Sequence, residues 1–181
     1  HLVFLRLKFK DYQLKYHKEI PPFPMIYIDW LETCHIKAKN TKKLYPGQKY
    51  PGLGLYPNFA VFFKKLAFQV GSRGAFNMPE YYHDAFLFHR DFWFYNPARE
   101  AEFRAVRKQF HFLKIRQVSD LLHQKKICKL NHRKEEVFPW KPAEMLSFID
   151  KSLHNIVFSR SWEKQIHKHI RELDFAICHQ N

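Results

Sequence analysis

The sequence predicts an α/β fold in which a mixed central sheet is flanked by helices. Residues 1–10 alternate apolar and basic side chains, the pattern of a half-buried strand. Residues 25–95 alternate strand-like and helix-like segments, as chains do when helices pack on a sheet. With 46% hydrophobic and 18% aromatic residues, the 181-residue chain can bury one sizeable core, so we expect a folded domain.

The first segments supply two strands. In residues 1–10, Leu5, Leu7 and Phe9 alternate with arginine and lysine side chains. A proline cluster at 21–24 interrupts the pattern, and the apolar run 25–32 predicts a second, more central strand. A polar, lysine-rich loop is expected at 37–43.

A glycine-rich turn and a helix come next. All five glycines lie in residues 47–74, so backbone that needs positive φ is concentrated there. Pro57 or Asn58 begins a predicted helix over 59–70, and Gly71 and Gly74 end it.

The following segment repeats the alternation. A short strand is expected at 75–77. Asn77 with Glu80 three residues later forms a capping signature for a helix at about 79–90. The aromatic run 92–95 predicts another strand.

Beyond Pro97 the pattern changes to helical periods. We therefore divide the chain into an α/β core, 1–97, and a mainly helical extension, 98–181, packed on the core. The core begins inside an apolar run, so we expect it to lack an upstream portion. The expected elements of the extension are helices at 98–112, 118–125, 142–158 and 161–173, a basic linker at 125–139 and a short strand at 174–178.

Composition excludes several classes of protein. No apolar run is long enough for a membrane span, and the residues show no signal-peptide pattern, so neither is expected. Cys34, Cys128 and Cys178 are far apart and odd in number, so neither a disulfide framework nor a zinc motif is expected. These features favour a cytoplasmic protein. The formal net charge of +14 predicts attraction to phosphate groups, in nucleic acid, lipid or a nucleotide-like cofactor.

Residues 48–55, Gln-Lys-Tyr-Pro-Gly-Leu-Gly-Leu, lie between a predicted strand and a predicted helix. Gly52 and Gly54 allow backbone amides to turn toward one point, and the free N–H groups of the next helix extend this anion site. A plain structural turn explains the same glycines, so both interpretations remain open. The sequence contains neither GxGxxG, which disfavours a dinucleotide fold, nor GxxxxGK[ST], which excludes a P-loop nucleotidase.

The order strand, G-x-G turn, helix, strand, helix, aromatic strand over 25–95 resembles the central half of the GNAT-type N-acetyltransferase fold. In that family the loop after the fourth strand has the pattern Q/R-x-x-G-x-G/A, and its amides hold the diphosphate of acetyl-CoA. Gly52 and Gly54 match the glycines, whereas Lys49, preceded by Gln48, stands where Gln or Arg is usual.

A second family pattern, N-x-x-A-x-x-x-Y followed by an aromatic residue, is matched in part. Ala85 and Phe94 fit its register, but Tyr82 replaces the Asn and His89 replaces the Tyr. The sequence also departs from the family at its end, because the family ends in a strand pair and residues 98–181 predict mainly helices.

The resemblance implies transfer of an acyl group from acetyl-CoA or another acyl-CoA to an amine. Glu32 would accept a proton from the attacking amine, and His89 would protonate the leaving thiolate. Simpler roles remain open: Glu32 as an exposed charge, His89 as a packed histidine and Asn77 as a helix cap. The implied cofactor-binding residues are Gln48, Lys49, Gly52, Leu53, Gly54 and Asn77.

The main alternative is a basic, non-enzymatic domain that binds nucleic acid or another protein. Lysines and arginines alternate with aromatic residues at 62–65 and 104–111, a composition that neutralises phosphates and can stack on bases. A metal site is not expected, because His83 and His89 are six residues apart on one helix and point in roughly opposite directions. Cys34 and His35, adjacent on a strand, face opposite sides of the sheet.

Overall fold

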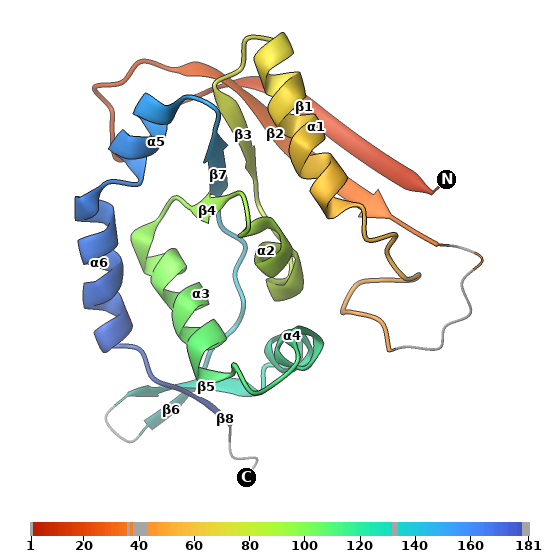
Figure 1. The fold of residues 1–181 in the computed structure, drawn as a ribbon. Coiled ribbons are helices and arrows are strands. Elements are labelled where there is room, and N and C mark those ends of the chain that lie inside the picture. The colour runs from red at the N-terminus through yellow and green to blue at the C-terminus, as the bar shows by residue number, and fades with distance from the viewer. Residues whose placement is uncertain (1, 36, 38–42, 132–133, 179–181) are drawn as a thin grey trace.

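A computed structural model describes residues 2–35, 37, 43–131 and 134–178 and confirms the α/β prediction (Figure 1). A mixed sheet in the order β1-β2-β3-β7-β4 and a smaller sheet in the order β6-β5-β8 are flanked by helices. The elements are β1 Val3–Tyr12, β2 Phe23–Thr33, α1 Tyr56–Gln69, β3 Gly74–Asn77, α2 Tyr82–Phe88, β4 Trp93–Phe94, α3 Pro97–Gln109, α4 Ile115–His123, β5 Ile127–Asn131, β6 Lys134–Val137, β7 Met145–Phe148, α5 Lys151–Val157, α6 Arg160–Arg171 and β8 Phe175–Ile177. The expected loop at 37–43 lies mostly outside the described residues.

Strands β1 and β2 form a long antiparallel hairpin at the edge of the large sheet. Leu7 pairs with Ile28 while Arg6 pairs with Trp30, so Asp29 is an extra, bulged residue of β2. The Asp29 carboxylate forms ion pairs with Lys8, at 2.8 Å, and with Arg6. The bulge therefore places a carboxylate between two of the basic side chains of β1.

Strand β3 runs parallel to β2 over only two residue pairs, Ile26 with Ala75 and Tyr27 with Phe76. Beyond Ile28, β2 continues alongside β1 to Thr33, whereas β3 ends at Asn77. Helix α1 connects the two strands and lies against this part of the sheet (Figure 1). The parallel pairing of β2 with β3 is therefore short, and β2 extends well beyond the end of β3.

The expected helix at 142–158 is wrong in its first part, because residues 145–148 form strand β7. This strand pairs antiparallel with both β3 and β4 and therefore lies inside the large sheet. Met145 and Leu146 are fully buried, one on each face of the sheet, and such short apolar runs do not distinguish a strand from a helix. The region 98–181 thus completes the core sheet as well as packing on it.

Gly74 makes this pairing possible. It was expected to help end the preceding helix, but it begins β3 opposite Phe148 of β7. A Cβ atom at Gly74 would clash with the backbone carbonyl of Ser147. The absence of a side chain is therefore a requirement of the contact between β3 and β7.

The small sheet corrects two further expectations. The segment 125–139 is not a plain linker, because it contains the β5–β6 hairpin, while the short strand expected at 174–178 is confirmed as β8. Cys128 and Cys178 form a disulfide with a Cα–Cα distance of 5.2 Å, contrary to the expectation that no disulfide is present. Since the two cysteines are 50 residues apart, only the pairing of β5 with β8 brings them together.

The other predicted helices are confirmed with shifted ends. Helix α1 starts at Tyr56, earlier than expected, and α2 is shorter than the expected 79–90. The residue before α2 is Tyr81, and no side chain caps this helix, so the capping role considered for Asn77 is wrong. Helix α3 does have a side-chain cap, because Asn96 Oδ1 accepts a hydrogen bond of 2.9 Å from the amide of Ala98.

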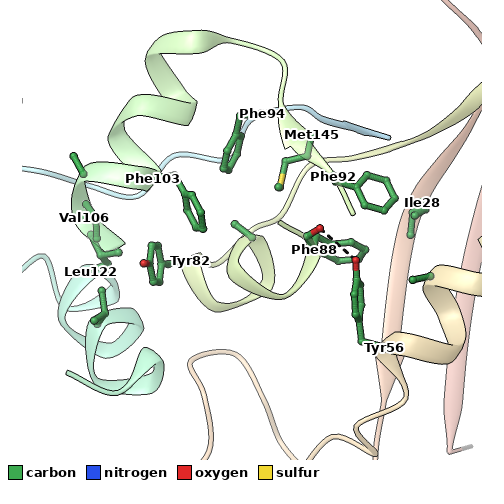
Figure 2. Close-up of a cluster of buried hydrophobic side chains, with 14 of the residues drawn as sticks. Ile28, Tyr56, Tyr82, Phe88, Phe92, Phe94, Phe103, Val106, Leu122 and Met145 are labelled. Carbon is green, nitrogen blue, oxygen red and sulfur yellow. Dashed lines mark hydrogen bonds between the residues drawn. The ribbon is translucent and has the colours of Figure 1, made fainter. Parts of the chain in front are cut away.

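The sheet carries hydrophobic cores on both faces. One core lies between the sheet and helices α1 to α4 and is built largely of aromatic rings (Figure 2). A second core, on the opposite face, includes Phe76, Leu146 and Leu153 of α5. No helix in the described part of the chain has both the length and the apolar character needed to cross a membrane.

A buried carboxylate connects four elements of the fold. Glu100 of α3 is fully buried, and its Oε2 accepts a hydrogen bond of 3.1 Å from the amide of Phe94 in β4. Its Oε1 lies 2.7 Å from His89 Nε2 and 2.7 Å from Arg104 Nε. Arg104 also donates to Glu163 of α6 at 2.6 Å. Burial raises the pKa of Glu100, but the contacts with His89 and Arg104 outweigh it and lower the pKa.

We expect Glu100→Ala to lower the free energy of unfolding by about 3–5 kcal/mol, because it leaves buried donors without an acceptor. Urea denaturation measures this change. The matched control is Glu163→Ala, which removes the more exposed carboxylate on the same arginine and is expected to cost less than about 1 kcal/mol. Equal losses in the two variants would contradict the central role of Glu100.

Candidate functional site

The turn at 51–55 is anchored to the end of β2. The carbonyl of Pro51 accepts a hydrogen bond of 2.8 Å from the amide of His35. The amide of Leu53 donates to Thr33 Oγ1 at 3.1 Å, and Gly52 lies against the same threonine. Gly52 and Leu53 are therefore held in place by the protein itself, and the Leu53 amide already has an acceptor.

The second half of the turn has free donors. Gly54 has φ of +69°, and a Cβ there would meet open space. Within the described residues, the amides of Gly54, Leu55 and Tyr56 donate no hydrogen bond. They lie at the N-terminus of α1, whose first turn contains no acidic residue. Free amides and the positive end of the helix dipole together form an environment suited to an anion.

Asn77, at the end of β3, is a buried polar side chain without a partner. Its exposed fraction is 3%, and both Oδ1 and Nδ2 lack a hydrogen bond in the structure. It alternates with Phe76, so it lies on the same face as Ala75, the face covered by α1 and α2. An unsatisfied buried amide costs roughly 1–3 kcal/mol, which makes Asn77 a candidate to bind a ligand.

The other buried polar side chains of the described chain differ from Asn77. They are Ser72, His83, Glu100 and Ser119. Each of them takes part in at least one hydrogen bond within the protein. Trp140 Nε1, on a partly buried ring of the same core, is also without a hydrogen bond, but Asn77 is the described side chain in which both a donor and an acceptor lack one.

Strand geometry relates Asn77 to the turn. The parallel register places Asn77 level with Ile28 of β2, and β2 then continues for five residues to Thr33, which holds the turn. Because Asp29 is bulged, β1 advances only four residues over this stretch, which at about 3.3 Å per residue is roughly 13 Å along the strand. The free amides and the unsatisfied amide side chain thus lie at opposite ends of one stretch of β2.

Two of the residues predicted to bind the cofactor, Gln48 and Lys49, make no contact with the turn at 51–55 through a hydrogen bond of their side chains. Gln48 closes a local turn, because its amide donates to the carbonyl of Tyr45 and its Oε1 accepts from the Tyr45 amide. Lys49 is exposed and makes no hydrogen bond or ion pair within the described residues. The structure therefore brings Gly52, Leu53 and Gly54 together but assigns Gln48 to a neighbouring turn.

Glu32 lies exposed near the end of β2, on the face opposite Thr33. Trp30 Nε1 donates to its Oε2 at 3.4 Å, and the Cys34 thiol donates to its Oε1 at 3.7 Å. Burial, aided by the nearby Glu32 carboxylate, raises the pKa of Cys34, so this thiol is not an activated nucleophile. Glu32 is accessible to a substrate, but it does not face the turn.

His89, the residue just after α2, belongs to the Glu100 network. Its Nε2 contacts Glu100, and its ring packs on Phe103 with a centroid distance of 4.4 Å. Among the described residues, neither Glu32 nor the turn contacts His89. The link between this region and α1 is made by Tyr56, whose hydroxyl donates to the Phe88 carbonyl at 3.3 Å (Figure 2).

The sequence analysis did not find a buried serine–histidine pair. His83 Nδ1 lies 2.9 Å from Ser119 Oγ of α4, and His83 Nε2 lies 3.3 Å from Asp84. The arrangement resembles a nucleophilic triad, but Ser119 is only 2% exposed, so a substrate cannot reach it. Tyr45 stacks on the His83 ring at 4.5 Å, which joins the loop before α1 to α2. No sequence signal identifies two residues 36 positions apart as partners.

Among the residues that the structure describes, no group of three or more histidine, cysteine, aspartate or glutamate side chains is arranged to hold a metal ion. His83 and His89 therefore belong to no such group.

Acid is expected to destabilise the protein through His83. Burial lowers the pKa of His83 to about 4, below the value of about 6.5 in an unfolded chain. As pH falls from about 6.5 to 4 the unfolded state takes up the proton first, so stability falls by about 3 kcal/mol from this group. Urea titrations at several pH values, compared between wild type and His83→Gln, measure the difference. Parallel pH profiles would contradict a neutral, buried imidazole.

A scan against protein-family models, a search of curated proteins and a search of solved structures each found no match to this chain. The function therefore has to be argued from the geometry of the turn, Asn77 and their surroundings.

Proposed function

We propose that the chain binds acetyl-CoA or another acyl-CoA, with the diphosphate at the amides of Gly54, Leu55 and Tyr56 and the acyl-bearing arm near Asn77. The observation that carries the proposal is the buried side chain of Asn77, which has neither of its hydrogen-bonding atoms satisfied. An amide side chain offers one acceptor and two donors, which suit the amide groups of a pantetheine arm.

The anion end of the site rests on backbone chemistry. Diphosphate oxygens accept hydrogen bonds from free N–H groups and are stabilised by the helix dipole at the start of α1. The chain's formal charge of +14 adds long-range attraction for a polyanionic ligand. About 13 Å of strand separates the turn from the level of Asn77, which suits a ligand that has a charged end, an extended arm and a reactive end.

The sheet supports the same interpretation. Strand β7, inserted antiparallel between β3 and β4, adds a strand to the large sheet where the sequence predicts only helix. The GNAT-type family ends in a strand pair, and β7 supplies one strand of the sheet in this part of the chain, although helices α5 and α6 follow it.

Acyl transfer would require a base beside the amine and an acid beside the leaving thiolate. Glu32 is exposed and able to act as a base, whereas the Nε2 of His89 is occupied by Glu100. We assign His89 a positioning role for α2 and β4. Glu32 lies on the face of β2 opposite Thr33, at the diphosphate end of the proposed site, so no proton acceptor is assigned for an amine at the acyl end.

The cellular compartment of the protein is part of the same proposal. The expectation of a cytoplasmic protein rests in part on the absence of a disulfide framework, but Cys128 and Cys178 form a disulfide, and disulfides persist mainly in oxidising compartments. The cysteines therefore no longer support a cytoplasmic location, which the proposed cofactor favours.

The decisive experiment is a calorimetric titration of the purified protein with acetyl-CoA and CoA. We expect saturable, micromolar binding that is lost in Gly54→Glu, because a carboxylate would occupy and repel the anion site. Gly71→Glu is the matched control, since Gly71 also has positive φ, +68°, and open space at its Cβ, but lies at the other end of α1. Binding that is absent in wild type, or lost equally in both variants, would overturn the proposal.

Replacing Asn77 tests the other end of the site. Asn77→Leu removes two unsatisfied polar atoms at similar volume and is expected to raise the free energy of unfolding of the ligand-free protein by roughly 1–3 kcal/mol. The same variant is expected to bind acetyl-CoA about tenfold less tightly, the loss of about 1.4 kcal/mol. Thermal denaturation and calorimetry measure the two effects, and a less stable variant with unchanged affinity would contradict them.

A basic binding domain without catalytic activity remains the second candidate. Helix α1 displays exposed rings, with Phe68 at 80% and Phe62 at 42%, beside exposed Lys64 and Lys65. Exposed rings among cations suit stacking on single-stranded nucleic acid. An oligonucleotide titration at several salt concentrations, run beside the acetyl-CoA titration, distinguishes the two functions.

A further inference from the structure

A cavity of about 180 Å³ lies between α2, α3 and α4, separate from the turn and from Asn77. It lies where α3 ends and α4 begins. Most of its wall is apolar and comes from side chains whose positions the core fixes. The lining residues are Tyr82, Phe86, Arg107, Phe110, His111, Leu113, Ile115 and Val118.

Tyr82 supplies a buried hydrogen-bonding group to this cavity. Its exposed fraction is 2%, and its ring packs edge-on against Trp140 at 5.5 Å. Its hydroxyl makes no hydrogen bond within the described residues, and Figure 2 shows it on the side of α4, near Leu122. Burial raises the pKa of Tyr82, so the hydroxyl stays protonated and remains a donor.

Arg107 supplies the charge. Its guanidinium lies 5.0 Å from the centre of the Phe86 ring, and within the described residues it has no carboxylate partner. Arg107 is also close enough to Tyr82 to lower the pKa of its hydroxyl, opposing the effect of burial. No acidic residue lines the cavity, and His111 donates its Nδ1 proton to the Lys108 carbonyl at 2.9 Å.

We propose that this cavity is a binding site for a small carboxylic acid with an apolar body, either aromatic or short aliphatic. The carboxylate accepts hydrogen bonds from the Arg107 guanidinium and the Tyr82 hydroxyl, while the apolar body contacts Phe86, Phe110 and Val118. A guanidinium offers the planar pair of donors that matches a carboxylate. A cavity of this size suits a ligand of about one ring, since apolar cavities of about 150 Å³ hold benzene.

The site is independent of the proposed acyl-CoA function. None of the lining residues belongs to the turn at 51–55 or to β3, so the two sites are tested separately. Gly54→Glu is therefore expected to leave the affinity for the small acid unchanged.

The test uses the purified protein and measures binding of benzoate and hexanoate by calorimetry, with benzyl alcohol and 1-hexanol as neutral analogues. We expect at least one of the two acids to bind saturably with a dissociation constant near or below about 1 mM. Each acid that binds is expected to do so at least about tenfold more tightly than its alcohol, because the charge-assisted bond is lost in the alcohol.

Two variants and one control locate the site. Arg107→Gln is expected to weaken binding of the acid about tenfold, and Tyr82→Phe, which keeps the ring, by several-fold. Lys108→Gln is the control, because Lys108 is the next basic residue on α3 and does not line the cavity. No saturable binding of either acid, equal binding of acids and alcohols, unchanged affinity in either test variant, or an equal loss in the control overturns the proposal.

Discussion

The arrangement of the helices depends on one buried carboxylate, that of Glu100. It is fully removed from water, and it accepts hydrogen bonds from the β4 backbone, from His89 after α2 and from Arg104 of α3. Arg104 extends the network to α6 through Glu163. A buried charge is tolerable only when every lone pair that faces the protein is used, so this network fixes the relative positions of the four elements. The strand it holds, β4, is only two residues long and pairs with β7 through two residue pairs, so it needs this additional support.

The same framework places two sites of different character. The turn at 51–55 offers free amides at the start of a helix, and Asn77 offers an unsatisfied amide side chain on the same side of the sheet. The cavity between α2, α3 and α4 combines apolar walls with Arg107 and the Tyr82 hydroxyl. In both places a polar group lacks a partner among the described residues although its neighbours are well packed. A buried polar group without a hydrogen bond lowers the free energy of unfolding, and a ligand that pairs with the group recovers this free energy.

Hydrogen bonding separates the residues that bind from those that support the fold. His89 and His83 both have the residue type expected at a catalytic site, but His89 is paired with Glu100 and His83 is paired with Ser119. Gln48 closes its own turn with Tyr45. These side chains already have partners, so they stabilise local structure. Asn77, for which the sequence equally permits a capping role, has no partner, because α2 begins at Tyr82 and its N-terminus does not reach back to the asparagine.

The sequence by itself determined the α/β class, the hairpin strands at the N-terminus, the G-x-G turn before α1 and the last short strand. These features follow from local periodicity and from the backbone preferences of glycine and proline, which act over a few residues. Only the tertiary structure decided that residues 145–148 form a strand inside the large sheet, that Cys128 pairs with Cys178, and that Arg107 and Tyr82 share a cavity. Each of these depends on contacts between segments distant in sequence, whose register is set by the burial of side chains on both faces of the sheet. A single sequence carries no local signal of such contacts.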